Sequence, residues 1–245
     1  MKKTLYFITL MVLIVIFAFS TYFIISNQME NKEQEEIFND VVSVVQTEDD
    51  SINEKLNGYM KLKSQNSDFI GWIKIEDTHI NYPVMQSSTP NFYLRKNFNK
   101  EYSDYGTPYI SELCDADKSD NLIIYAHNMK NHQMFGDLGK YKSKDFYNSH
   151  KYILFDTLNH QGTYEIISVF KTMADAFDYQ NYADFADEEQ FNTFMDKCKS
   201  LSLYDTDTNS AYGDRLITLS TCEYSQNNGR LVVIAKQIEV SSYEA

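Results

Sequence analysis

The residues best suited to chemistry lie near the C-terminal end of the chain, where a cysteine closes one predicted strand and an arginine opens the next. Cys222 ends the predicted strand 215–222, and Arg230 begins the predicted strand 230–238. If these strands pair across the polar loop between them, the two side chains become neighbours. A guanidinium beside a thiol favours the thiolate and can donate hydrogen bonds to an oxyanion on the attacked carbonyl. A buried cysteine near a surface arginine is the alternative interpretation.

A second candidate is His127, which follows an apolar run that begins at Leu122. Strand alternation places Ile123, Tyr125 and His127 on one face. An imidazole at the end of a strand can give a proton to a departing amine and take one from an incoming nucleophile. A structural or simply exposed histidine fits the same pattern. His132 has no cysteine or carboxylate at ligand spacing nearby, so we expect no zinc site.

The elements that must position these residues are mostly short strands. Runs of β-branched and aromatic residues, separated by turn residues, begin near residue 69 and predict about eight strands. A hairpin turn is expected at 159–162. The predicted strands cover 71–75, 80–86, 109–113, 122–127, 151–157, 163–172, 215–222 and 230–238.

Two inserts between the strands are predicted to be helical, at 134–147 and at 188–201. In the second insert, apolar residues recur at spacings of three and four, which is typical of a helix with one buried face. Cys198 lies on this stripe, so we expect it to pack in the core. No repeat or proline-rich linker interrupts the region, which indicates one compact β-rich domain. The stripe consists of Phe191, Phe194, Met195, Cys198 and Leu201.

The N-terminal segment predicts a membrane anchor. Residues 4–26 form a run of 23 without a charge, preceded by Lys2 and Lys3, which favours a helix with a cytoplasmic N-terminus. A cleaved signal peptide is the alternative, with a small-x-small site at 18–20, but the apolar run continues to Ile25. We therefore expect a cytoplasmic segment 1–3, a transmembrane segment 4–26, a helical spacer 27–66 and an extracellular domain 67–245.

Composition restricts the possible partners of the exported part. The chain has 245 residues and a formal charge of −13, and without Lys2 and Lys3 it carries 20 basic against 35 acidic residues, a net charge of −15. Nucleic-acid binding depends on clustered basic residues, so this class of partner is excluded. Three cysteines are an odd number for an oxidising compartment, which leaves at least one thiol unpaired.

Three motifs together resemble the sortase family, and within it class B. They are TLSTC at 218–222 with Arg230 eight positions on, YAHNMKN at 125–131 and MFGDL at 134–138. The resemblance extends over about residues 69–238. It implies a mainly β fold: an eight-stranded sortase-type β-barrel with N-terminal helices and a helix inserted before the last two strands. It also implies a membrane-anchored cysteine transpeptidase of a Gram-positive cell surface, with 67–245 as its catalytic domain.

The resemblance also implies roles for individual residues. Cys222 would be the nucleophile that cleaves a C-terminal sorting motif after threonine, His127 the general acid and base, and Arg230 the group that positions substrate and stabilises the oxyanion. The partners would be secreted proteins bearing the motif and an amine of peptidoglycan or of its lipid-linked precursor, with no cofactor and no metal. Residues that match substrate-contacting positions are Ser220, Glu223, Leu94 and Tyr182.

Two departures from the class B pattern concern loops near these residues. Ala126 stands where many members have glycine, and Ser225-Gln226 stands where an aromatic–acidic pair often follows. They leave loop shape and motif preference open. Two other functions also fit the residues: a cysteine protease or hydrolase that uses water as acceptor, and a membrane-tethered binding protein without chemistry.

Overall fold

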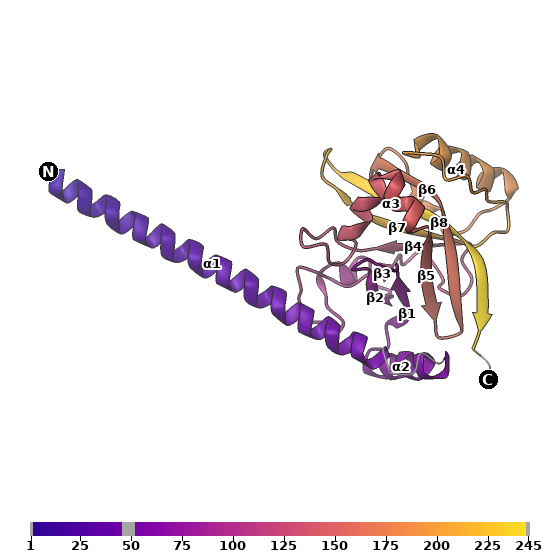
Figure 1. Cartoon of the computed structure of the whole chain (residues 1–245), viewed down its shortest axis with the longest axis horizontal. Coiled ribbons are helices and arrows are strands. Elements are labelled where there is room, and N and C mark those ends of the chain that lie inside the picture. The colour runs from indigo at the N-terminus through magenta and orange to yellow at the C-terminus, as the bar shows by residue number, and fades with distance from the viewer. Residues whose placement is uncertain (1, 46–51, 244–245) are drawn as a thin grey trace. The chain divides into compact units, whose positions relative to one another are not determined.

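The structure is a computed structural model that describes residues 2–45 and 52–243 (Figure 1). The chain divides into two compact units, Met1–Asp40 and Val41–Ala245. Parts of the predicted segments 1–3, 27–66 and 67–245 lie outside the described residues, namely residue 1, residues 46–51 and residues 244–245.

The first unit is helical. Helix α1 (Lys2–Val45) starts in this unit, and its apolar side chains between Leu5 and Ile25 are exposed. The helix is long and apolar enough to cross a membrane. It continues through the polar residues after Ser26 because neither glycine nor proline interrupts the chain before Val45.

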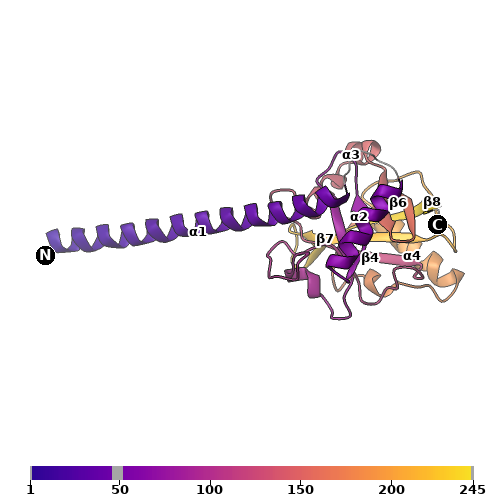
Figure 2. The ribbon, with the colours of Figure 1, turned by 90° about the horizontal axis from the view of Figure 1, so that it is seen from below.

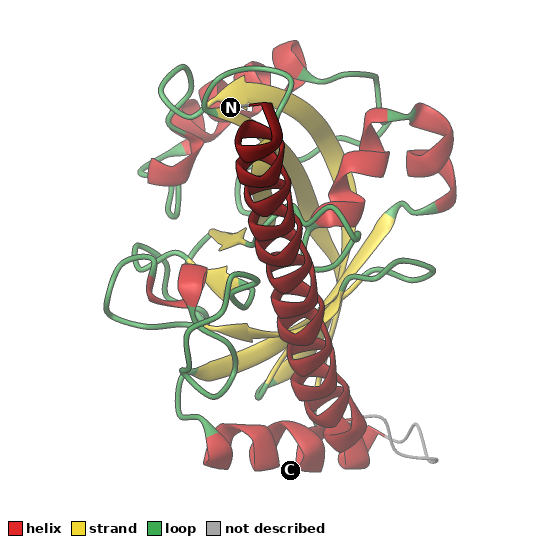
Figure 3. Cartoon of the chain, turned by 90° about the vertical axis from the view of Figure 1, so that its left-hand side faces the viewer, coloured by secondary structure: helices red, strands yellow, loops and turns green. Residues whose placement is uncertain are grey.

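The second unit is built on a closed β-barrel, drawn in yellow in Figure 3. The strands follow the order β1-β2-β3-β4-β7-β8-β6-β5 around the barrel. Pairs β2–β3 and β4–β7 are parallel, and the others are antiparallel. All eight predicted strands are present, so the predicted barrel fold is confirmed. Their bounds are β1 Phe69–Lys74, β2 Asn81–Met85, β3 Tyr109–Ile110, β4 Asn121–Tyr125, β5 Tyr152–Thr157, β6 His160–Met173, β7 Leu216–Glu223 and β8 Gly229–Ser242.

The hairpin turn predicted at 159–162 was placed too late in the sequence. The connection between β5 and β6 is only Leu158 and Asn159, because the Thr157 hydroxyl accepts hydrogen bonds from the Asn159 and His160 amides and closes the turn at once. Gly162, expected in the turn, is already paired with Phe155 in the ladder.

The prediction of a single helix at 134–147 was wrong. The structure has a 3-10 helix η2 (Gly136–Lys142) followed by a short helix α3 (Lys144–Ser149). Ser143 separates them because its backbone is extended, with φ −97° and ψ 127°. The remaining short helices are η1 (Phe92–Arg95) and η3 (Tyr179–Asn181).

The helix predicted at 188–201 is confirmed as α4 (Glu188–Leu201). It begins there because the Asp187 carboxylate accepts a hydrogen bond of 2.9 Å from the Gln190 amide, which caps the first turn. The predicted apolar stripe faces the barrel, and Cys198 is completely buried. The hydroxyl of Ser168, on β6, donates a hydrogen bond to the Cys198 carbonyl.

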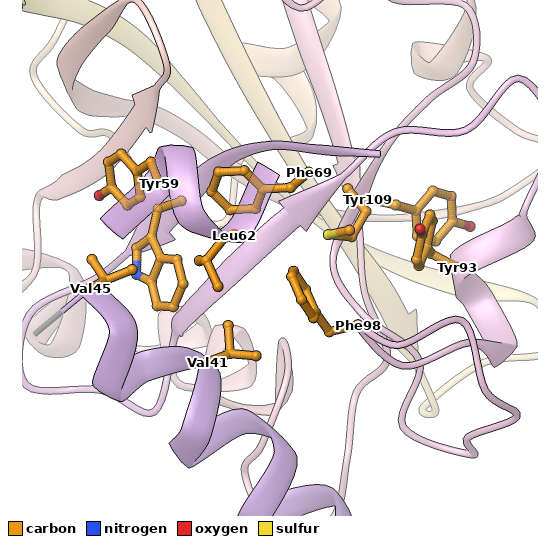
Figure 4. Close-up of a cluster of buried hydrophobic side chains, with 10 residues drawn as sticks. Val41, Val45, Tyr59, Leu62, Phe69, Tyr93, Phe98 and Tyr109 are labelled. Atoms are coloured by element: carbon orange, nitrogen blue, oxygen red, sulfur yellow. The ribbon is translucent and has the colours of Figure 1, made fainter. Parts of the chain in front are cut away.

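Helix α2 (Ile52–Gln65) covers the opposite end of the barrel from α4 (Figures 1 and 2). Tyr59 and Leu62 pack there on Phe69 and Trp72 of β1, together with Val41 from the last turn of α1 (Figure 4). Burying these large side chains is the main source of stability at this end of the domain.

Candidate active site

A cavity of about 460 Å³ lies at the barrel surface where β4, β7 and β8 come together. Its walls come from the ends of these strands and from the segments that carry η1, β3 and η3. The predicted residues Cys222, His127, Arg230, Leu94 and Ser220 all line it. The fold therefore gathers five residues from distant parts of the sequence around one groove.

Cys222 is the only one of the three cysteines that lines this groove. It is the second-last residue of β7, and the β7–β8 register pairs it directly with Arg230. Cys114 and Cys198 are buried elsewhere, and burial raises the pKa of the Cys114 thiol to about 11 and that of Cys198 further. Only the half-buried Cys222 is accessible to a substrate in the groove.

Hydrogen bonds fix the end of β7 around Cys222. The Asn128 side-chain amide donates to the Cys222 carbonyl at 2.8 Å, and the Thr221 hydroxyl donates to the Ala126 carbonyl at 2.8 Å. The Tyr224 hydroxyl donates to the Asn128 carbonyl. The strand that carries the thiol is thus bound to the loop that carries His127.

His127 follows β4, which ends at Tyr125 rather than at the predicted residue 127. Its Nε2 lies 2.8 Å from the Leu94 carbonyl oxygen, and because a carbonyl only accepts, Nε2 carries a proton and donates it. Burial lowers the pKa of His127 while the bond to Leu94 opposes that shift, and the neutral form is favoured at pH 7. Nδ1 is then the nitrogen available for proton exchange. Within the described residues no hydrogen bond joins His127 to Cys222.

The Arg230 guanidinium donates hydrogen bonds to backbone carbonyls of its own hairpin. Its guanidinium donates to the Gly229 carbonyl at 3.0 Å and to the Asn228 carbonyl at 3.5 Å. Among the residues that the structure describes, no acidic side chain forms an ion pair with it. The remaining donors can therefore serve a substrate carbonyl.

Two of the predicted substrate contacts lie away from the groove lining. Glu223 is buried, accepts hydrogen bonds from the Ser225 amide and hydroxyl, and lies 3.5 Å from Lys142 Nζ. Tyr182 packs in an aromatic cluster, 4.9 Å between ring centroids from Phe194 of α4. As placed, these two side chains shape the loops beside the groove.

Several groove residues were missed in the sequence. Tyr179, in η3, lines the wall near Ser220 and shares a hydrogen bond of 2.6 Å with its hydroxyl. Its segment has no periodic pattern, so nothing in the sequence marked it. Asn128 does not line the groove but holds the Cys222 carbonyl, and it could have been found because it directly follows His127 in the motif. The described residues contain no group of three acidic, histidine or cysteine side chains that could hold a metal.

Comparisons with known proteins show what this chain is similar to. A family model described as "Sortase domain" matches residues 73–238. Sortase B of Staphylococcus aureus is 32% identical over 251 residues, which cover 98% of this chain and 99% of the relative. The structure of a Staphylococcus aureus sortase B–substrate complex matches with a TM-score of 0.78 and 30% identity, covering 86% of this chain and 99% of that one. A sortase B complexed with triglycine matches with a TM-score of 0.75 and 28% identity, covering 89% of this chain and all of that one (100%).

Proposed function

The chain belongs to the sortase family of cysteine transpeptidases, in its class B, and from this premise we propose that it joins secreted proteins covalently to the cell wall. The observation that supports the proposal most directly is the register that pairs Cys222 with Arg230 in a groove shared with His127. A thiol, an imidazole that exchanges protons, and a guanidinium with donors left for the substrate are groups that suit acyl transfer.

In the first half of the proposed reaction, Sγ of Cys222 attacks the threonine carbonyl of a sorting motif. Neutral His127 takes the thiol proton on Nδ1, and the Arg230 guanidinium donates to the oxyanion of the tetrahedral intermediate. The C–N bond after threonine then breaks, and His127 returns its proton to the departing amine. A thioacyl enzyme remains.

In the second half of the proposed reaction, an amine rather than water accepts the acyl group from the thioacyl enzyme. The incoming amine attacks the thioester carbonyl, and His127 takes its proton. The C–S bond then breaks, and His127 passes that proton to the departing Cys222 sulfur, which restores the thiol and the neutral imidazole. The products are a new amide and free enzyme. The substrate and triglycine complexes of the related sortase B structures support a motif peptide and an amine as the two ligand classes.

We propose that Leu94 and Ser220 contact the motif, since both line the groove. Glu223 and Tyr182 would influence the same peptide through loop shape. The proposed segments are 1–3 in the cytoplasm, 4–26 in the membrane, 27–66 as spacer and 67–245 as the catalytic domain outside. The exposed apolar helix and the flanking Lys2 and Lys3 support this arrangement.

The test presents a library of C-terminal sorting-motif peptides to the membrane-embedded full chain and identifies products by mass spectrometry. We expect cleavage after threonine, and a new amide product when triglycine or a diaminopimelate-containing stem peptide is added. The Cys222→Ala variant, which keeps the fold, should form neither product.

Three outcomes would contradict the proposal. Hydrolysis of the peptide without any amide product, even when an amine is added, would indicate a cysteine hydrolase. Full anchoring of a secreted substrate in cells by the Cys222→Ala variant would indicate the binding protein. Cleavage at positions unrelated to threonine would exclude the sorting reaction.

A further inference from the structure

Outside the groove, one buried carboxylate contacts several segments that surround the catalytic histidine. Asp137, the second residue of η2, has a side chain with 0% exposure. Residues 126–135 form the loop that contains His127, called here the His127 loop. Asp137 lies two residues after the end of this loop. The mechanism proposed above does not use this carboxylate.

Each oxygen of Asp137 contacts a different set of donors. Oδ2 accepts hydrogen bonds from the His79 amide at 3.0 Å and from His79 Nδ1 at 2.8 Å, in the β1–β2 turn. Oδ1 lies 3.2 Å from His132 Nδ1 in the His127 loop and 2.9 Å from Lys140 Nζ in η2. Oδ1 lies within ion-pair distance of these two side chains but accepts no hydrogen bond within the described residues. One side chain therefore contacts the β1–β2 turn, the His127 loop and η2.

The charge of Asp137 is maintained by His79 and Lys140. Burial alone would raise the pKa of its carboxyl, but the His79 amide, Lys140 and the His79 ring together bring that pKa below its ordinary value. The carboxylate is therefore ionised at neutral pH. An ionised group without exposure holds its donors firmly, because losing one would leave a buried charge unpaired.

The His127 loop needs such support because its backbone is unusual. His132 and Met134 both have positive φ, at 67° and 54°, a backbone conformation that residues other than glycine rarely adopt. The Met134 amide donates to the Tyr82 hydroxyl at 3.1 Å, and the Phe135 amide donates to the His127 carbonyl at 2.9 Å. The far end of the loop is thus joined directly to the backbone of His127.

The near side of the same loop is held by the β7 strand, through the bond from Asn128 to the Cys222 carbonyl. We propose that Asp137 is a positioning residue for His127: its carboxylate fixes the far side of the loop, so that the imidazole stays bonded to Leu94 and directed into the groove. The inference rests on the proposed function, in which His127 exchanges protons with Cys222.

The experiment measures alkylation of Cys222 by iodoacetamide at pH 7 in the full chain in membranes, with labelling at Cys222 read by mass spectrometry. Asp137→Asn keeps the shape of the side chain and removes its charge. We expect it to slow alkylation roughly tenfold, because an imidazole displaced by about 1 Å takes the thiol proton less readily. In a His127→Ala background, the same substitution should cause no further change.

A matched control is Asp156→Asn. Asp156 on β5 also accepts a hydrogen bond within the fold, from the Tyr59 hydroxyl at 2.9 Å, but it does not contact the His127 loop. The control should lower thermal stability and leave the alkylation rate of Cys222 unchanged. In turnover of a sorting peptide, Asp137→Asn should lower kcat roughly tenfold and leave KM within about twofold.

The inference is overturned if Asp137→Asn slows alkylation equally with and without His127, or if it changes only thermal stability as the control does. It is also overturned if His127→Ala alone alkylates at the wild-type rate. Alkylation needs no sorting peptide, so the two proposals fail separately. A chain that passes these tests but forms no amide product loses the transpeptidase function and retains this positioning role.

Discussion

Cys222 differs from the other two thiols of the chain by its surroundings. Cys114 and Cys198 are buried, which raises the pKa of each thiol and excludes reagents. Cys222 faces a groove next to a guanidinium that no carboxylate neutralises in the described structure. None of the three cysteines forms a disulfide, so the expected difference in reactivity comes from where each thiol lies in the barrel.

The contribution of Arg230 can be measured by changing its side chain. Arg230→Ala removes the proposed donor to the oxyanion, and loss of one such donor typically costs roughly 10²–10³ in kcat. Arg230→Lys should recover only part of the rate, because an ammonium does not reproduce the planar fork of a guanidinium. Steady-state kinetics with a sorting peptide would check this, and an Arg230→Ala enzyme with unchanged kcat would exclude the oxyanion role.

The pH dependence of the reaction should report His127. Burial lowers its pKa from the ordinary 6.5, and the proposed mechanism needs the neutral imidazole. The rate should therefore fall as pH decreases through a value below 6.5, and kcat/KM measured from pH 4 to 8 should show that limb. A midpoint well above pH 7 would instead indicate that formation of a charged Cys222–His127 pair limits the rate.

Short motifs were sufficient to predict that Cys222, His127 and Arg230 lie around one groove. The pairing of Cys222 with Arg230 followed from two strands joined by a short loop, whereas His127 was predicted from the apolar run before it. Tyr179 was not predicted, since its place in the groove depends on how the β6–α4 connection folds back over β7. Glu223 sits next to the nucleophile in sequence, yet strand alternation turns it away from the groove toward Lys142. Sequence adjacency was a poor guide for that residue.

Among the elements, the hairpin of β7 and β8 sets the distance between thiol and guanidinium. Gly229 opens β8 opposite Glu223, and a Cβ at this position would collide with the Glu223 backbone oxygen. Gly229→Ala should therefore separate the two strands at their open end, lowering both kcat and the melting temperature. Gly139→Ala is the control, because nothing lies within 4 Å of a Cβ at that position. Equal activity of the two variants would contradict this account.

Helix α2 should contribute stability without contributing chemistry. Leu62 is completely buried against β1, and Leu62→Ala should cost about 2–5 kcal/mol of unfolding free energy through lost packing and a cavity. Met60 on the same helix is 58% exposed, so Met60→Ala should change stability by no more than about 0.5 kcal/mol. Thermal unfolding of both variants measures the difference, and equal melting temperatures would show that α2 does not support the barrel.

The type of nearly every helix and strand could be predicted from the sequence. The predicted bounds were wrong where a particular side-chain contact or backbone conformation ends the element. Strands were recognised from alternation and composition, and α4 from its stripe and its acidic start. The β5–β6 turn was misplaced because the Thr157 hydroxyl closes it early, a contact that composition does not reveal. The helix at 134–147 was misjudged because the extended backbone of Ser143 divides this segment into η2 and α3.

For the molecule as a whole, the N-terminal helix should decide where the enzyme works. Deleting residues 2–26 should release the chain from the membrane fraction, since these residues hold the only long apolar run in the sequence. Fractionation of cells, with alkaline carbonate washing, would show the difference. A control deletion of residues 27–31, in the polar part of α1, should leave the chain in the membrane. Full retention of the truncated chain would contradict anchoring by this helix.

The parallel pairing of β4 with β7 has a consequence for how the enzyme matures. Asn128 and the Cys222 carbonyl that it bonds are 94 positions apart, so the site closes only when the last two strands join a barrel whose other strands precede them. In the proposed arrangement, residues 4–26 enter the membrane while the N-terminus stays in the cytoplasm, long before the thiol of Cys222 leaves the translocation channel. The nucleophile should acquire its partners in the final step of folding, which protects the emerging polypeptide from acylation while it is still incomplete.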